Sequence, residues 1–217
     1  MGFIHLHTHS HFSLLQSTNT MEGLFRVASE DKMPALALTD HGNMFGALDF
    51  FLKGKEWGVK PIIGCEVYVV ANRFLKMGYG SDDGELAPYD VCSSGLHHLV
   101  LLCQNDLGYQ NLCRLVSLSY LEGFYYRPRV DAEILARYSE GLVALSGCLK
   151  GEIPYWCLAG NRDKAREKVQ FYKSTYPDRF YLEMQAGAAD AELFCKARFI
   201  PASPFQSFAD HFSFELL

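Results

Sequence analysis

The chain has 217 residues, of which 49% are hydrophobic, and it carries a formal net charge of −5. This length and composition suit one globular domain, or one domain and a fragment, and exclude an intrinsically disordered chain. The negative charge argues against a broad basic surface for nucleic acid, because such a surface needs many Lys and Arg residues to meet phosphates. Any contact with nucleic acid should be local or come from a neighbouring domain.

The cysteines and the first residues bear on the cellular compartment. The seven cysteines are an odd number and contain no C-x-x-C pair, which argues against a disulfide framework and favours a reducing cytoplasm. The first ten residues, MGFIHLHTHS, lack the charged start and apolar stretch of a signal peptide, and the chain contains no apolar run of 18 residues. We therefore expect a soluble, cytoplasmic protein that does not contact a membrane.

Short apolar runs alternate with stretches of helical period, a pattern typical of repeated βα units around a mostly parallel sheet or barrel. The predicted strands are Phe3–His7, Ala35–Thr39, Pro61–Val69, His98–Cys103, Leu142–Ser146 and Arg179–Glu183. The predicted helices are Met21–Glu30, Met44–Trp57, Gly108–Leu121, Ala132–Tyr138 and Arg162–Tyr176.

Three segments fall outside this pattern. Residues 77–94 are rich in Gly and acidic residues, and they predict an exposed excursion between two strands. Residues 123–130, GFYYRPRV, predict a loop packed by its own tyrosines, with a phosphate-contacting loop as the alternative. From Ala186 onward no period holds, so residues 1–185 are expected to form the domain and residues 186–217 a divergent tail.

Four of the eight histidines lie at alternating positions in the first eleven residues, His5, His7, His9 and His11. Alternation places all four on one face of an extended strand. Burying or charging four stacked imidazoles is costly unless they bind something, and neutral imidazole is a common ligand of zinc and similar ions. The histidine run therefore predicts a metal site, and a merely polar strand is the alternative.

Further ligand-type side chains occur near the ends of the later predicted strands. Asp40 and His41 follow the second strand in a T-D-H-G turn, which on its own could also be an Asx turn. Glu66, His98 and Cys148 lie at or just beyond the next strands. So many imidazole, carboxylate and thiol groups exceed the four ligands of a structural zinc, and they predict two or three ions and metal-assisted phosphoester hydrolysis.

Six segments carry a resemblance to a known family. They are HLHTHSHFSLL, ALALTDHGNMFGALDF, GVKPIIGCEVYV, HHLVLLCQNDLGYQNLCRLVS, GFYYRPRVDAEIL and EGLVALSGCLKGEIP. Together they resemble the PHP (polymerase and histidinol phosphatase) domain of bacterial DNA polymerase III alpha subunits, from about residue 3 to residue 185. The resemblance implies an α/β fold, a distorted (β/α)7 barrel that is incomplete at its C-terminal end here.

The resemblance also implies a ligand set and a metal. Divalent ions, zinc or manganese and up to three in number, would be bound by His7, His9, His41, Glu66, His98 and Cys148, with His5 and Asp40 orienting these ligands. In two places the chain departs from the family. Gln16 stands where the family usually has a bridging Asp, and the final Asp and His of the family are not recognisable in residues 186–217, where the Asp210-His211 pair has other neighbours. A truncated or frame-shifted reading frame would explain the tail.

Three functions follow from the resemblance as hypotheses. The first is the N-terminal domain of a replicative polymerase with 3′–5′ exonuclease or phosphoesterase potential, which would act on DNA but could not polymerise it alone. The second is a non-catalytic scaffold that braces the rest of the alpha subunit or docks the proofreading exonuclease subunit. The third is a free-standing phosphatase that resembles histidinol phosphatase.

Overall fold

The computed structural model describes residues 3–76 and 95–184. Its helices are α1 (Met21–Glu30), α2 (Ala47–Trp57), α3 (Asp106–Leu121), α4 (Ala132–Arg137), α5 (Glu152–Leu158) and α6 (Arg162–Thr175). Its strands are β1 (Ala35–Leu38), β2 (Lys60–Val69), β3 (His97–Cys103), β4 (Arg129–Val130), β5 (Leu142–Leu145) and β6 (Phe180–Tyr181). The predicted excursion at 77–94 and the predicted tail at 186–217 lie outside the described residues.

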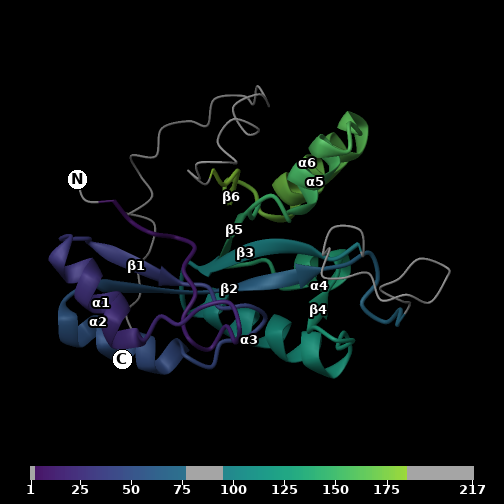
Figure 1. Cartoon of the computed structure of the whole chain (residues 1–217). Helices are drawn as coiled ribbons and strands as arrows, with labels where there is room; N and C mark the ends of the chain where they lie inside the picture. The colour runs from purple at the N-terminus through teal and green to yellow at the C-terminus, as the bar shows by residue number, and fades with distance from the viewer. Residues whose placement is uncertain (1–2, 77–94, 185–217) are drawn as a thin grey trace.

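One open, curved sheet organises the molecule, in the order β1-β2-β3-β5-β6, with β4 paired to β2 (Figure 1). The pairs β1–β2, β2–β4 and β5–β6 are parallel, whereas β3 runs antiparallel to both β2 and β5. The predicted α/β fold of the PHP type is confirmed, and the sheet is not closed. Between β2 and β3 the described residues contain no helix, and a parallel connection would have required such a crossover.

Strands β1, β3 and β5 and most of β2 bury both of their faces. On one face alternate strand residues such as Leu36, Val67 and Leu101 pack against the helices in the larger core. On the other face Ala37, Ile62 and Val100 form a smaller core. In Figure 1, α1, α2 and α3 lie below the sheet and α5 and α6 lie near β5 and β6, so the helices follow its outer face as it curves. The smaller core marks the inner, barrel-like face.

The first residues do not form the predicted strand Phe3–His7. They run alongside β1, where the Ala37 N–H donates to the His5 carbonyl at 2.9 Å and the Thr39 N–H donates to the Thr8 carbonyl at 2.8 Å. Ile4 and Leu6 pack against the inner core. This N-terminal segment, residues 3–10, therefore lies along the edge of β1 and brings His7 and His9 to the inner face.

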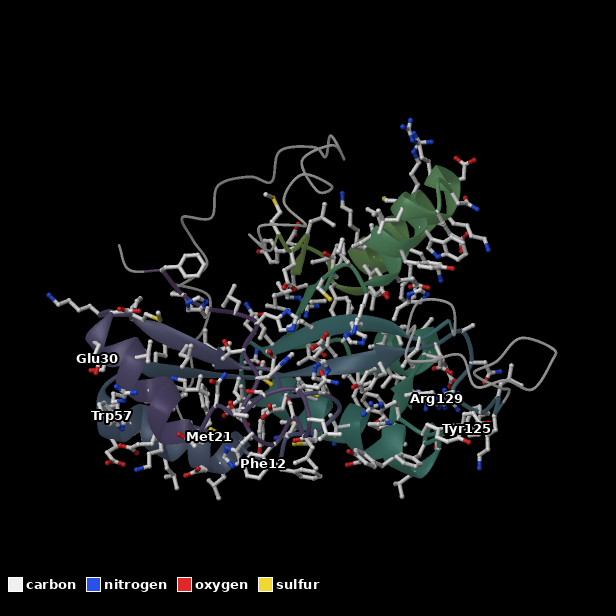
Figure 2. All side chains as sticks on the ribbon, viewed as in Figure 1. Phe12, Met21, Glu30, Trp57, Tyr125 and Arg129 are labelled. Carbon is white, nitrogen blue, oxygen red and sulfur yellow. The ribbon has the colours of Figure 1, made fainter. Side chains whose placement is uncertain are left out.

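Turns fix the next part of the chain onto α2. After residue 10 the chain turns, and Phe12 and Met21, both labelled in Figure 2, lie where a side chain on Gly46 would be. A Cβ atom on Gly46 would come within 2.3 Å of Met21 and 2.9 Å of Phe12. Close packing at Gly46 therefore joins the turns to the start of α2.

The predicted helices are found, with ends that differ by a few residues, but the prediction missed α5 and β4. The helix α5 has Pro154 in its first turn, where the missing N–H of proline removes no helix hydrogen bond. The strand β4 has only two residues, lies within the segment that was predicted as a loop and pairs with β2. No helix in the described part of the chain has the length and apolar character to cross a membrane.

The start of α3 depends on a backbone contact that only glycine allows. The Asn105 side chain caps the helix by accepting from the Gly108 N–H at 3.0 Å. A Cβ atom on Gly108 would lie 1.8 Å from the carbonyl oxygen of Gly141, which has a φ of +72°. Gly108, the glycine of the GYQNL segment, is therefore needed because the backbone of Gly141 packs directly against it.

We expect Gly108→Ala to lower the free energy of unfolding by about 3 kcal/mol, because the added methyl group must push two backbone segments apart. Chemical denaturation followed by circular dichroism measures this. The control Ser117→Ala, at an exposed position of the same helix, should change stability by less than about 0.5 kcal/mol. Equal stability of the two variants would contradict the close-packing argument.

Candidate metal centre

Five predicted ligands converge on the inner face of the sheet. His7 and His9 come from the N-terminal segment, His41 follows β1, and Glu66 and His98 lie on β2 and β3. Glu66 and His98 share the inner face because β2 residues 62 and 66 and β3 residues 98, 100 and 102 alternate with the helix-facing residues. Since β3 is antiparallel, its first residues meet the same end of the sheet as the last residues of β1. We call these five residues the Glu66 cluster.

The Glu66 carboxylate lies at the centre of this cluster. Its Oε2 atom is 3.0 Å from His7 Nε2, 2.8 Å from His9 Nε2 and 3.2 Å from His41 Nδ1. Its Oε1 atom pairs with His98 Nδ1. The cluster contains two groups with ligand atoms within 4.8 Å of one another, His7-His9-Glu66 and His41-Glu66-His98, and Glu66 belongs to both.

The nitrogen atoms of the cluster fit a metal better than they fit a hydrogen-bonded network. His9 Nε2, His41 Nδ1 and His98 Nε2 are buried and have no hydrogen-bond partner among the described residues. Two of them approach Glu66 closely but with directions that do not make a hydrogen bond. Buried polar atoms normally have a hydrogen-bond partner. Several buried nitrogens without one, arranged around a single carboxylate, match the ligand atoms of a metal site.

Charge is distributed unevenly over the cluster. Burial opposes ionisation of Glu66, but the attraction of the neighbouring His7, His9 and His98 outweighs it and holds the pKa of this carboxyl well below its usual range. Burial lowers the pKa of His41 to about 3, with neighbouring histidines adding to the effect against the attraction of Glu66. His41 is therefore neutral, which is the form that binds metal.

His7 has the opposite charge state in the metal-free protein. Burial favours neutral imidazole, but the hydrogen bonds to Glu183 and Glu66 are stronger and raise the pKa of His7 to about 10. A proton on His7 thus partly neutralises the buried Glu66 carboxylate. A cation bound at the cluster would take over this neutralising role.

Asp40 supports the cluster through the backbone. Its buried carboxylate accepts hydrogen bonds from the Ser10 N–H and hydroxyl, both at 2.7 Å, and from the Ser13 hydroxyl at 2.6 Å. The Ser13 oxygen also accepts from the His41 N–H at 3.1 Å. Asp40 contacts no imidazole through these bonds, but it fixes the residues next to His9 and His41.

We expect Asp40→Ala to lower the free energy of unfolding by about 3 kcal/mol, because it leaves the N–H and hydroxyl groups of Ser10 and Ser13 buried without their acceptor. Urea denaturation of the metal-free chain measures the loss. Asp163→Ala, which removes an exposed carboxylate of α6, is the control and should leave stability nearly unchanged. A loss as small as that of the control would show that Asp40 does not hold this segment.

Other predicted residues lie outside the cluster. The expectation that four histidines share one strand face is wrong, because the chain turns after residue 10. His11 packs against Phe12 with ring centroids 4.4 Å apart, and His5 is exposed and packs against Phe3 at 4.8 Å. The orienting role expected for His5 therefore finds no support in the described contacts. Gln16 lies in an exposed turn.

Cys148 lies near the cluster without joining either group of ligand atoms. It follows β5, where the Gly147 backbone passes close to the His98 carbonyl. Burial raises the pKa of the Cys148 thiol, and the charges of Glu66 and Glu183 add to this rise against the backbone N–H of Lys150. Metal binding by the Cys148 thiol stays a prediction.

The aromatic loop at residues 123–130 is held by its own contacts. The rings of Tyr125 and Tyr126 lie 4.7 Å apart, and the Arg129 guanidinium lies 5.3 Å from the Tyr125 ring (Figure 2). Arg129 is buried and donates to three backbone carbonyls, those of Gly123, Leu75 and Arg73. The contact of Tyr125 with Tyr126 agrees with the prediction of a loop packed by its own tyrosines, and Arg129 also ties the loop to residues 73–75.

An acidic residue that touches the cluster was not predicted from the sequence. Glu183 Oε1 lies 2.7 Å from His7 Nδ1, and both side chains are largely buried. Glu183 ends the predicted strand Arg179–Glu183, the same kind of position that drew attention to the other ligands. That position was the available signal, but a lone acidic residue after a short strand is too common to be singled out by itself.

The chain belongs to the PHP domain family, whose model matches residues 5–187. Among its curated relatives are DNA polymerase III alpha subunits. The chain is 44% identical over 184 residues to that of Borreliella burgdorferi, 84% of this chain and 15% of the relative. It is 46% identical over 189 residues to that of Thermus aquaticus, 85% of this chain and 15% of the relative. The chain thus spans about 15% of the length of these relatives.

A solved structure is also similar. An amidohydrolase from Chromobacterium violaceum aligns with a TM-score of 0.36 and 19% sequence identity, over 77% of this chain and 54% of that protein.

Proposed function

We propose that this chain is the PHP domain of a bacterial DNA polymerase III alpha subunit and that its Glu66 cluster holds at least two divalent metal ions. The observation that carries the proposal is the sharing of Glu66 by two groups of ligand atoms. A carboxylate can offer one oxygen to each of two cations and reduce their mutual repulsion. The similarity to polymerase alpha subunits supports the assignment to that protein.

Each half of the cluster would hold one ion. His7, His9 and Glu66 would offer three donors to the first ion, and His41, His98 and Glu66 would offer three donors to the second. Three donors leave open positions, which is typical of catalytic rather than structural sites. Bound zinc or manganese would supply Lewis-acid activation of water and of a phosphoester.

In the whole polymerase the domain would lie beside DNA, the remainder of the alpha subunit and, as a further proposed partner, the proofreading exonuclease subunit. A cytoplasmic location is part of the same proposal. The scaffold alternative is favoured by one observation, because uncharged Gln16 stands where a bridging carboxylate is expected. We therefore propose that metal binding persists in this chain while hydrolysis is lost.

The first expected result is that the purified 217-residue chain retains metal through dialysis without hydrolysing substrate. Three donors per ion suffice for binding, but hydrolysis also needs the two ions close enough to share a water, and uncharged Gln16 stands where a carboxylate that bridges them is expected. Elemental analysis measures the metal, and release of nucleotide from single-stranded DNA or of phosphate from a phosphomonoester, with added manganese, measures turnover.

The double variant His7→Ala, His9→Ala is the control for background activity. We expect it to lose metal and to match the chain in its turnover, which is none above background. Turnover by the chain that this control abolishes would restore an active phosphoesterase. A chain that retains no metal would contradict the metal centre itself.

The second expected result concerns the number of ions. Because Glu66 belongs to both groups, Glu66→Gln should lose both ions, whereas His98→Ala should lose only the ion that His41 and His98 share. Metal content per folded chain, checked by circular dichroism, gives the stoichiometry. Glu152→Gln replaces a carboxylate that pairs with Lys168 and Tyr172 outside the cluster, and it should keep both ions. Retention of both ions by Glu66→Gln would rule out a shared carboxylate.

A further inference from the structure

We infer that Glu183 is a positioning residue that aims the metal-binding nitrogen of His7 into the Glu66 cluster. The inference rests on the proposed metal centre and adds to it a residue outside the ligand set. The observation behind it is that the two ring nitrogens of His7 have separate partners. His7 Nδ1 lies 2.7 Å from Glu183 Oε1, and His7 Nε2 lies 3.0 Å from Glu66 Oε2.

The chemistry of the pair defines which nitrogen carries the proton. A carboxylate at neutral pH only accepts hydrogen bonds, so the hydrogen in the contact with Glu183 must be on His7 Nδ1. In the metal-free protein Nε2, which faces Glu66 and His9, carries a proton too. A metal would displace the proton on Nε2 and take its lone pair, while the hydrogen on Nδ1 stays with Glu183. A carboxylate behind a ligating imidazole fixes its ring orientation and increases its basicity.

The backbone around Glu183 is held firmly enough to orient its partner. The Glu183 N–H donates to the Ser146 hydroxyl at 2.9 Å, and the Ser146 N–H donates to the Tyr181 carbonyl at 3.0 Å. Ser146 is buried at the end of β5. Glu183 is thus fixed to the last strands of the sheet, whereas His7 belongs to a segment beside the first strand.

This contact spans the open side of the sheet. In the strand order β1 and β6 are the two edge strands, and the N-terminal segment lies on the outer side of β1. The His7–Glu183 bond joins these two edges directly above the cluster. If Glu183 only connected the two edges of the sheet, its replacement would change stability but not the hydrogen bond at His7 Nδ1 or the intrinsic metal affinity.

The test measures zinc affinity of the 217-residue chain by competition with a chromophoric chelator. We expect Glu183→Ala to weaken zinc binding about 10- to 100-fold, and Glu183→Gln to weaken it by about 10-fold, because the amide oxygen still accepts but carries no charge. The matched control Glu152→Gln makes the same chemical change at another largely buried carboxylate and should leave affinity within about twofold.

A spectroscopic readout separates positioning from stability. In the zinc-loaded chain with ¹⁵N-labelled histidine, His7 should give a downfield, exchange-protected Nδ1–H resonance. We expect it to remain with Glu152→Gln and to disappear with Glu183→Ala. If Glu183→Ala does not fold, Glu183→Gln carries the test, with a weakened and shifted resonance expected.

The outcomes distinguish this inference from the function on which it rests. Zinc binding by the chain with unchanged affinity in both Glu183 variants would overturn the positioning role and leave the metal centre intact. Weaker binding with an unchanged His7 resonance would also overturn it, because Glu183 would then act only through stability. Absence of zinc binding by the chain itself would remove the metal centre and this inference together.

Discussion

The burial of one carboxylate among four imidazoles is the constraint on which the rest of the structure depends. Glu66 is 1% exposed, and a buried charge is tolerated only when it is paired and hydrogen-bonded. Its partners come from the N-terminal segment, the end of β1 and the start of β3. If one of these segments moved away, the Glu66 carboxylate would stay in an apolar environment without the imidazole that pairs with it. The position of Glu66 thus determines where three separate parts of the backbone must lie.

The surrounding polar groups extend this constraint outward in steps. Asp40 binds the residues between His9 and the turn that follows, and Glu183 binds the outer nitrogen of His7. Each of these acids is itself anchored, Asp40 directly after β1 and Glu183 through Ser146. The cluster is therefore supported by rigid elements rather than by loops alone, a condition that binding geometry requires.

Much of this arrangement could be predicted from the sequence, because ligand type and strand position are local signals. His7, His9, His41, Glu66 and His98 each stand near the end of a predicted strand or in an alternating run, and these local positions suffice to predict the set. Their convergence is reported by the structure. The metal itself is still a proposal.

The parts that could not be predicted depend on contacts between distant segments. Periodicity does not reveal strand direction, so the antiparallel orientation of β3 was not foreseen. His5 alternates with His7 as regularly as His9 does, and only the course of the chain separates it from the cluster. The role of Glu183 depends on its contact with His7, which lies 176 residues earlier in the chain, and no local sequence pattern predicts this contact.

The attachment of the N-terminal segment has a thermodynamic consequence. Backbone hydrogen bonds to the β1 region and the bonds of Ser10 to Asp40 hold a stretch that supplies two of the five side chains of the cluster. A cation that binds only when this stretch is in place is a ligand of the native state, and by mass action it contributes about 2.7 kcal/mol when its free concentration is 100 times its dissociation constant. The free energy of unfolding therefore rises with the concentration of the free ion. The order of residues 3–10 and the occupancy of the cluster are two measures of one equilibrium.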